Sequence, residues 1–494
     1  MTIDIENNVL EKRRAGILLH ITSLPGEGST GDLGAHAFRF VELLADSGLS
    51  VWQTLPVGPT HSDGSPYQCL SAHAGNPLLI DLTWLVEHDL LPPDRVVSAV
   101  NDRESRLKCL CEASVVFSTV TSGELLEKYR RFVHFHAYWL KDFALFMALK
   151  RHFQHLPWWD WPRACRDHEP EALARMRIKL EQDIRQVEFE QFVFFQQWHE
   201  LRRHAHHHGV LLFGDMPIYV ATDSADVWAN RHYFLLDESG RPTVVAGVPP
   251  DYFSATGQRW GNPHYDWEAM QKDGFKWWVE RMHTQLELFD WVRIDHFRGF
   301  EAYWEIPVDS ETAVNGRWVE APGEALMTAI YEHFGALPLI AENLGIITPE
   351  VEALRKKFGI PGMLVLQFAF DGGPDNPYLP HNHAADNVVY TGTHDNDTTL
   401  GWFDSLSREQ QAHIYDYLGH PQISMPWALM RAAFASVATL AMVPMQDVLG
   451  LGEGERMNTP GTTEGNWNWR FRWEQLQPHH SDRLRHWAHL YGRS

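Results

Sequence analysis

Three features are scarce in this sequence, and each scarcity excludes a class of protein. The 494 residues include only four cysteines, and no two of them form a Cys-x-x-Cys pair, so free thiols are expected rather than a disulfide framework. Positive charge is also scarce, because 42 Lys and Arg face 64 Asp and Glu, for a formal net charge of -22. Nucleic acids and anionic membrane surfaces attract basic faces, so we expect neither as a partner.

Long apolar segments are the third scarcity. The first 14 residues are polar and lack the apolar stretch of a signal peptide. The longest mostly apolar run, 432–445, is shorter than the ~20 residues of a membrane span, and we interpret it as a buried helix end followed by a strand. These features predict a cytoplasmic protein. Aromatic residues, in contrast, are abundant, with 26 Phe, 21 Trp and 14 Tyr, which suits a neutral sugar ligand as well as a large core.

The apolar segments that are present predict a fold. Most are nearly continuous rather than alternating, as in strands buried on both faces of a parallel sheet. The eight segments are 16–25, 50–60, 210–220, 289–300, 337–345, 362–370, 387–396 and 438–450. Helical patterns lie between them, for example at 38–48, 349–358 and 408–418. Strand and helix alternating eight times predict an α/β fold, a TIM (β/α)8 barrel.

Two intervals are too long for simple strand–helix units. Residues 61–209 carry mostly helical patterns, among them 124–152 and 170–208. Residues 221–288 are rich in glycine, proline and aromatic residues. We expect one barrel over 1–494, with both intervals inserted as subdomains on its catalytic face.

Carboxylates end five consecutive predicted strands. They are Asp215, Asp295, Glu342, Asp371 and Asp395. A single acidic strand end is usually a helix cap or a solvated loop. Because the carboxyl ends of barrel strands share one rim, five together favour an active site.

The segment 291–299 (Trp-Val-Arg-Ile-Asp-His-Phe-Arg-Gly) has the clearest chemistry. Side chains alternate along a strand, so Arg293 and Asp295 point to the same side. A neighbouring cation favours the ionised form of a carboxylate, which a covalent nucleophile needs. The alternative is a buried ion pair that only braces the strand.

Two further segments carry carboxylates of different character. An apolar run delivers Glu342 to the rim, where desolvation would raise its pKa as a general acid requires; the alternative is a cap on the next helix. Asp395 lies beside His394 and suits hydrogen bonds to sugar hydroxyls and stabilisation of positive charge at an anomeric carbon. The alternatives for Asp395 are a turn or a metal ligand.

Asp295 and Glu342 together match the requirements of a retaining glycosidase. Such enzymes hold a nucleophilic carboxylate and a proton-donating carboxylic acid ~5–5.5 Å apart. Neighbouring strands lie ~4.8 Å apart, so adjacent strand ends supply this separation.

With these motifs the chain resembles the amylomaltases, the 4-α-glucanotransferases of glycoside hydrolase family 77 in the α-amylase clan. The resemblance extends from residue 16 to 469. Beyond the three acidic segments, it is carried by residues 58–60, 65–68, 74–77, 214–219, 247–254, 258–263, 456–461 and 465–467. The chain departs from the family at Cys69 and His73, where small and aromatic residues are usual, and it lacks the N-terminal extension of some members.

The resemblance implies roles for matching positions. Asp295 would be the nucleophile, Glu342 the acid/base and Asp395 the transition-state stabiliser, and residues 248–258 would fold over bound glucan. The expected substrate-binding residues are Tyr67, Asp215, Asp251, Phe253, Gln258, Trp260, Arg293, His296, Asp371, His394 and Asn466. No metal ion or cofactor is expected.

The implied activity is transfer of an α-1,4-glucan segment from a donor maltooligosaccharide to the 4-hydroxyl of an acceptor glucan or glucose. Three alternatives remain. They are a retaining hydrolase of the same clan, a glucan-binding protein without catalysis, and a metal-dependent barrel enzyme. The last would use the histidines at 204, 206, 207 and 208, which a solvated helix end explains better.

Overall fold

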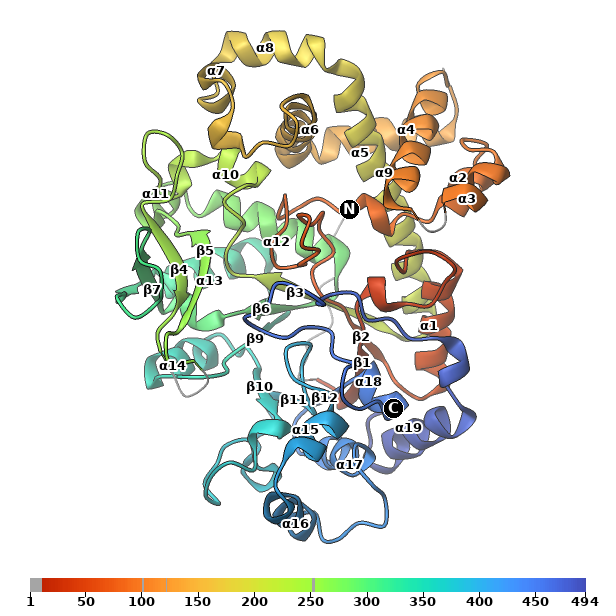
Figure 1. Cartoon of the computed structure of the whole chain (residues 1–494), viewed down its shortest axis with the longest axis vertical. Helices are drawn as coiled ribbons and strands as arrows, with labels where there is room; N and C mark the ends of the chain where they lie inside the picture. Colours follow the sequence, from red (N-terminus) through yellow and green to blue (C-terminus); the bar gives the residue numbers. More distant parts are fainter. Residues whose placement is uncertain (1–10, 100–101, 121, 251–253) are drawn as a thin grey trace.

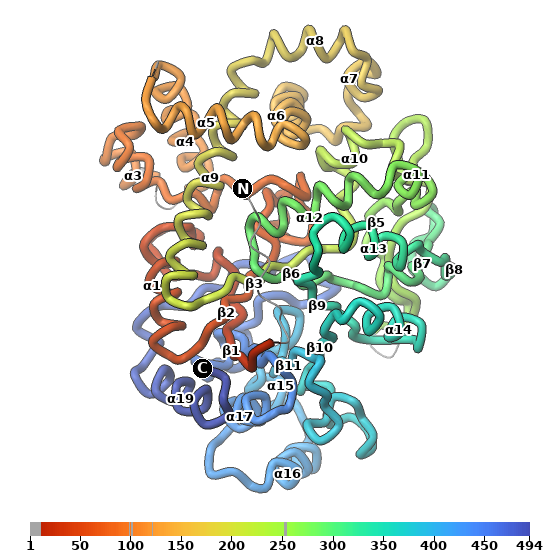
Figure 2. The backbone as a smooth tube through the Cα atoms, turned by 180° about the vertical axis from the view of Figure 1, so that it is seen from behind, coloured from red at the N-terminus to blue at the C-terminus, as the bar shows by residue number. Residues whose placement is uncertain are grey.

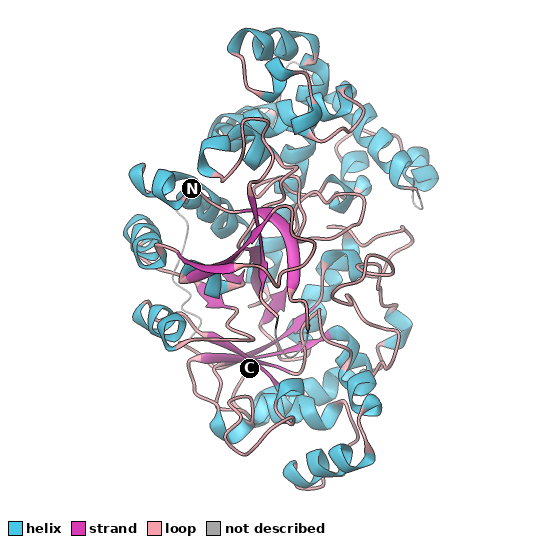
Figure 3. Ribbon diagram, turned by 60° about the vertical axis from the view of Figure 1, so that its left-hand side comes forward, coloured by secondary structure: helices cyan, strands magenta, loops and turns pink. Residues whose placement is uncertain are grey.

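A ring of eight parallel strands forms the centre of the protein. The computed structural model describes residues 11–99, 102–120, 122–250 and 254–494. The strands are β1 (Arg14–Leu18), β2 (Val51–Gln53), β3 (Leu211–Pro217), β6 (Trp291–Asp295), β9 (Leu339–Ala341), β10 (Gly362–Val365), β11 (Asn387–Tyr390) and β12 (Leu440–Pro444). They pair in the order β10-β11-β12-β1-β2-β3-β6-β9, and helices surround them (Figure 3). The predicted barrel is confirmed, with strands shorter than the predicted segments.

The two end strands of this sheet meet and close the barrel. The backbone N–H of Ala341 donates to the carbonyl of Pro361 at 2.8 Å. Asn343 Oδ1 accepts from the N–H of Met363, also at 2.8 Å. A Cβ at Gly362 would lie only 2.9 Å from Asn343, so a glycine permits this approach of β9 to β10. Asn343 thereby joins the two strands directly after Glu342.

Side-chain alternation decides which residues face the barrel interior. A buried apolar cluster inside the ring includes Phe213 on β3, Trp291 on β6 and Ile340 on β9. Residues two positions further along these strands point the same way. Asp215 and Arg293 therefore continue the inner rows of β3 and β6, above the apolar cluster.

Helices cover the outside of the barrel. They are α1 (Ala35–Asp46), α12 (Lys276–Leu288), α13 (Gly323–Phe334), α14 (Pro349–Lys357), α15 (Thr399–Ser405), α16 (Arg408–Tyr417), α17 (Trp427–Ala435), α18 (Met445–Leu449) and α19 (Pro478–Leu490). The expected eightfold alternation fails once. Residues 366–386 hold two 3-10 turns and no α-helix, because Pro374, Pro377 and Pro380 interrupt the segment. The apolar run 432–445 is the end of α17 followed by β12, as predicted.

The interval 61–209 forms a helical layer beyond the barrel, at the top of Figure 1. Its helices are α2 (Leu82–Glu87), α3 (Pro93–Ala99), α4 (Arg103–Ser118), α5 (Glu124–Phe135), α6 (Ala137–His152), α7 (Arg163–Arg166), α8 (Pro170–Lys179) and α9 (Glu181–His207). The predicted helix 124–152 is interrupted at His136, and the predicted helix 170–208 at Leu180. Figure 2 shows α9 running from this layer down beside α1. The boundaries of the inserted subdomains stay predictions. Within the four described ranges, no helix is both long and apolar enough to cross a membrane.

A second, antiparallel sheet was not predicted. Its strands are β4 (Val244–Val248), β5 (Gln258–Pro263), β7 (Ala302–Pro307) and β8 (Arg317–Glu320), in the order β5-β4-β7-β8. It lies to one side of the barrel, near two short helices, α10 (Ala225–Ala229) and α11 (Trp267–Lys272) (Figure 1). Strands that pair across a long sequence separation carry no local signal of their partner. This sheet places Gln258 and Trp260 beside the rim of the barrel.

Candidate active site

Arg293 holds two carboxylates at the carboxyl end of the barrel. β3 and β6 pair with Asp215 opposite Arg293, and Arg293 Nη1 donates to the two oxygens of Asp215 at 2.8 and 2.7 Å. Arg293 Nη2 donates to Asp295 Oδ1 at 2.8 Å. Burial alone would lower the pKa of Arg293, but the charges of Asp215 and Asp295 outweigh it and raise that pKa well above its ordinary value. A permanent cation therefore orients Asp295, on the shared face that alternation predicted.

Glu342 lies beside Asp295 because their strands are in register. Ile294 pairs with Ala341, so Asp295 and Glu342 follow at equivalent positions, and the Glu342 N–H donates to the Ile294 carbonyl at 3.0 Å. The Glu342 carboxylate accepts from the N–H groups of His296 at 2.7 Å and Leu344 at 2.8 Å. Burial, reinforced by the charge of Asp295, raises the pKa of Glu342 to about 7 against the opposing effect of Arg293. Glu342 can thus exchange a proton near neutral pH.

Tyr67 bridges the strand ends and the loop that follows β11. Its hydroxyl donates to Asp215 Oδ2 at 2.9 Å, and its ring stacks on His394 with centroids 5.0 Å apart and planes 16° apart. Burial raises the pKa of Tyr67 well above its ordinary value, so the hydroxyl keeps its proton. The ring of Trp467 lies 5.9 Å from that of Tyr67. The three rings form an aromatic wall beside the carboxylates.

Asp395 is held by a different part of the chain. Asn458 Nδ2 donates to Asp395 Oδ1 at 2.6 Å, and Arg456 Nη2 donates to the Asp395 carbonyl at 2.8 Å. His394 Nε2 lies 3.4 Å from the same Oδ1. We had not assigned this role to Arg456 or Asn458, although the motif 456–461 was part of the family resemblance. Only the folded chain shows which side chain that motif restrains.

Three further predicted binding residues lie at the edge of this cluster. The rings of Trp260 and His296 meet edge to face, 4.9 Å between centroids. Burial lowers the pKa of His296 to about 4, so its ring is neutral. Its Nε2 is buried and, within the described residues, has no hydrogen-bond partner. Gln258 Oε1 accepts from Trp260 Nε1 at 3.1 Å and is exposed. An unsatisfied imidazole nitrogen at this position suits a sugar hydroxyl.

The remaining predicted binding residues are not gathered into the cluster. Asp371 is exposed in the segment after β10 and accepts from Asn376 at 3.2 Å. The amide of Asn466 is engaged by Thr459 and Thr462, so it braces its own loop. Asp251 and Phe253 lie outside the described residues. Contact of these four residues with substrate stays a prediction.

The two departures from the family pattern lie behind Tyr67. Cys69 and His73 line a cavity of about 40 Å³ together with Tyr67 and Asp215. His73 Nδ1 lies 2.8 Å from Thr284 Oγ1, and burial lowers the pKa of His73 to about 3. Burial also raises the pKa of Cys69 to about 12. Both side chains are therefore neutral groups that pack behind Tyr67.

The carboxylate cluster does not suit a metal ion. The oxygens of Asp215 and one oxygen of Asp295 already accept from Arg293. A bound cation would share these oxygens with a buried guanidinium, and like charges at this distance repel strongly. The arrangement instead fits a carboxyl group of raised pKa, Glu342, beside a carboxyl group, Asp295, that accepts a hydrogen bond from Arg293.

Comparison with known proteins agrees with this geometry. The sequence profile of the family described as 4-alpha-glucanotransferase matches residues 19–477. The 4-alpha-glucanotransferase of Thermus thermophilus is 51% identical over 488 residues, which cover 96% of this chain and 97% of the relative. The chloroplastic/amyloplastic 4-alpha-glucanotransferase of Arabidopsis thaliana is 45% identical, covering 98% and 86%.

Solved structures give the same result. Amylomaltase from Streptococcus agalactiae in complex with acarbose is 38% identical and superposes with a TM-score of 0.94, covering 98% of this chain and 100% of that one. Amylomaltase from Corynebacterium glutamicum shares the fold at 18% identity and a TM-score of 0.79, covering 98% and 76%. The profile and the curated relatives span nearly the whole chain, including every strand of the barrel that carries a carboxylate. The chain therefore belongs to the 4-alpha-glucanotransferase family, the amylomaltases.

Proposed function

We propose that this protein is a 4-α-glucanotransferase that acts by a retaining double displacement through a covalent glycosyl–aspartate intermediate. The observation that carries the mechanism is the difference in environment between the neighbouring carboxyl groups of Asp295 and Glu342. Arg293 donates to Asp295, whereas burial raises the pKa of Glu342 to about 7. Adjacent carboxyl groups with separated charge states are what the nucleophile and the acid of a retaining enzyme require.

In the first half-reaction, the proton of Glu342 moves to the glycosidic oxygen. An Asp295 oxygen attacks the anomeric carbon, the bond to the leaving glucan breaks, and a β-glycosyl ester forms on Asp295. Positive charge develops on the sugar ring in the transition state. The carboxylate of Asp395 stabilises that charge and binds ring hydroxyls, and the free Nε2 of His296 binds another hydroxyl.

In the second half-reaction, the Glu342 carboxylate takes the proton of an acceptor's 4-hydroxyl. The acceptor oxygen attacks the anomeric carbon and releases Asp295. Two inversions restore an α-1,4 bond with net retention. The acceptor is a glucan or glucose.

Transfer exceeds hydrolysis only where the acceptor is positioned and water is excluded. The rings of Tyr67, His394 and Trp467 form an aromatic wall at the site, and the ring of Trp260 packs edge to face against His296. These surfaces suit the faces of glucose rings. The segment 248–258, of which 251–253 lie outside the described residues, would complete this enclosure over bound glucan.

Incubation with pure maltotriose tests the proposal. A transferase yields a ladder of longer maltooligosaccharides together with glucose, while the number of reducing ends stays nearly constant. A retaining hydrolase of the same clan, the alternative, yields one new reducing end for each bond cleaved. A protein that only binds glucan yields no new products.

We also propose that the enzyme needs no cofactor and that it is cytoplasmic. Because no step above uses a metal ion, dialysis against EDTA should leave the rate of ladder formation unchanged. Loss of the rate on dialysis, restored by added metal, would contradict the mechanism.

A further inference from the structure

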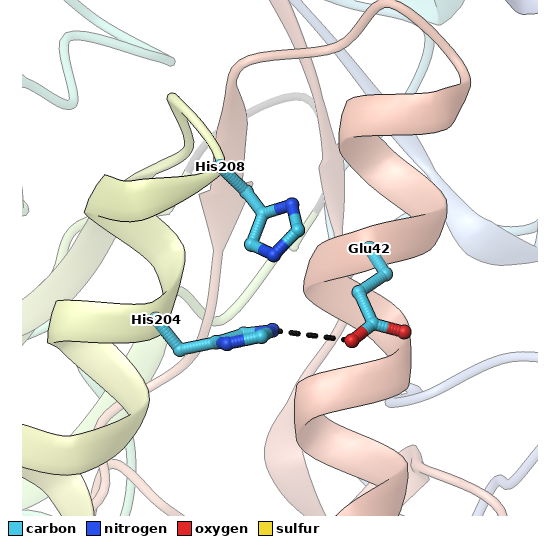
Figure 4. Close-up of side chains that lie close together, drawn as sticks. All are labelled: Glu42, His204 and His208. Carbon is cyan, nitrogen blue, oxygen red and sulfur yellow. Dashed lines mark ion pairs between the residues drawn. The ribbon is translucent and has the colours of Figure 1, made fainter.

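Two histidines and a glutamate converge where the long helix α9 ends against α1. His204 and His208 are four residues apart at the end of α9, so they lie on one face of the helix. Glu42 projects from α1 toward both rings (Figure 4). One ligand atom from each of the three side chains lies within 4.8 Å of the other two. The group lies just before β3 begins, at the end of the barrel opposite the carboxylates.

The hydrogen bonds of this group leave an imidazole unsatisfied. His204 Nε2 lies 3.4 Å from Glu42 Oε1, which is long for a hydrogen bond between these groups. This nitrogen is buried from water and, within the described residues, has no hydrogen-bond partner. A histidine nitrogen that makes no hydrogen bond can offer its lone pair to a metal ion.

The four clustered histidines differ in their partners. His206 Nε2 lies 2.9 and 3.0 Å from the two oxygens of Asp290, which satisfies it. His207 is exposed, and it is not among the three residues whose ligand atoms converge. Of the four histidines, His204 and His208 are the two whose ligand atoms converge with Glu42, and their ring centroids lie 4.5 Å apart. The local packing therefore selects two rings of the four.

Two histidines and one carboxylate form a recognised ligand set for zinc. Zn–N and Zn–O bonds of ~2.0–2.1 Å in a tetrahedron place neighbouring ligand atoms about 3.3 Å apart. The 3.4 Å between His204 Nε2 and Glu42 Oε1 matches that edge. The negative end of the α9 dipole and the formal net charge of -22 both favour a cation here.

We propose that Glu42, His204 and His208 bind one divalent transition-metal ion of the zinc class and that this ion fixes the end of α9 to α1. Water completes the fourth position. The role is structural, because the group lies at the opposite end of the barrel from Asp295 and Glu342. Binding to the folded state alone raises its stability in proportion to the logarithm of the metal concentration above the dissociation constant.

Calorimetric titration of the untagged, EDTA-dialysed protein with zinc chloride tests this site. We expect one saturable equivalent with a micromolar or lower Kd and a rise in Tm on addition of zinc. Glu42→Ala and His208→Ala should each weaken the affinity at least tenfold and abolish the rise in Tm. Glu42 is half exposed, so its replacement leaves the fold intact.

His207→Ala is the matched control, because it removes an imidazole from the same helix end and keeps all four cysteines. Its zinc affinity and Tm response should equal those of the unaltered protein. The proposal is overturned if the unaltered protein binds no zinc, if Glu42→Ala and His208→Ala bind it unchanged, or if His207→Ala loses as much affinity as His208→Ala. Transfer activity on maltotriose should be the same for all variants in the absence of zinc.

Discussion

The active site has two halves that are held in place in different ways. Asp215, Arg293, Asp295 and Glu342 sit on or directly after barrel strands, and strand register sets their spacing. Asp395 lies in a loop, and a second loop restrains it through Arg456 and Asn458. The side chain of Asp215 is 1% exposed and that of Arg293 6%, whereas that of Asp395 is 48% exposed.

This difference separates chemistry from access. Groups that exchange a proton or form a covalent bond need positions fixed to a fraction of an ångström, which paired strands provide. A polymer substrate must also enter and leave, which requires a side of the site that can open. Variants in the strand half should therefore affect catalysis and folding strongly, and variants in the loop half should affect catalysis moderately and folding little.

Asp295→Asn should give the largest effect. The amide keeps the shape of the side chain but cannot form the glycosyl ester, so transfer from maltotriose should fall by ~10⁴-fold or more. Maltotriose binding, measured by calorimetry, should persist because the surrounding rings remain. Residual transfer within about 100-fold of the unaltered enzyme would remove Asp295 from the nucleophile role.

Glu342→Gln should follow, with a loss of ~10²–10⁴-fold in kcat. Because the pKa of Glu342 is raised to about 7, kcat/KM of the unaltered enzyme should fall as the pH rises through about 7. The variant should lack this alkaline limb, and Asn458→Ala should retain it. An unchanged limb in Glu342→Gln would assign the proton to another group.

The same group makes stability depend on pH. A folded-state pKa raised above its unfolded value contributes stability that is complete below the unfolded pKa and is lost as the pH rises through the folded value. For Glu342 this loss lies between about pH 4.5 and 7. The free energy of unfolding, measured in urea, should differ less between pH 5 and pH 8 in Glu342→Gln than in the unaltered protein.

Arg293→Met tests how much the buried ion pair in the strand half contributes to the free energy of unfolding. It leaves Asp215 buried without its cation, and breaking a buried pair in this way costs ~3–5 kcal/mol in the free energy of unfolding. Arg456→Met is the matched control in the loop half, where the cation is partly exposed and a loss below about 1 kcal/mol is expected. Equal losses, measured by urea denaturation, would contradict the division into two halves.

Asn458→Ala should give the smallest effect. It removes the hydrogen bond to Asp395, and hydrogen bonds to charged groups contribute ~1.5–3 kcal/mol, so kcat/KM should fall by about 10–100-fold with little change in unfolding free energy. Asn466→Ala is the control, since that amide braces the same loop without contacting Asp395. If Asn466→Ala reduces the rate as much, loop order rather than the contact to Asp395 is responsible.

Sequence by itself determined the barrel and the strand half of the site. Nearly continuous apolar segments that alternate with helical patterns indicate buried parallel strands, and a carboxylate or cation two residues beyond an inward-facing side chain shares its face. That local rule was enough to place Arg293 with Asp295, and strand order was enough to place Glu342 beside them. The prolines at 374, 377 and 380 are also a sequence signal for the broken alternation at 366–386.

Tertiary structure alone decided the contacts that join distant loops. Asn458 reaches Asp395 across 63 residues, Asn343 closes β9 onto β10, and Glu42 meets His204 and His208 across two helices. The antiparallel sheet likewise pairs β4 with β7 over an intervening barrel strand. Such contacts depend on the direction in which the chain leaves the end of each strand. Hydrophobic periodicity indicates which face of a helix or strand is buried. It does not indicate which other element covers that face.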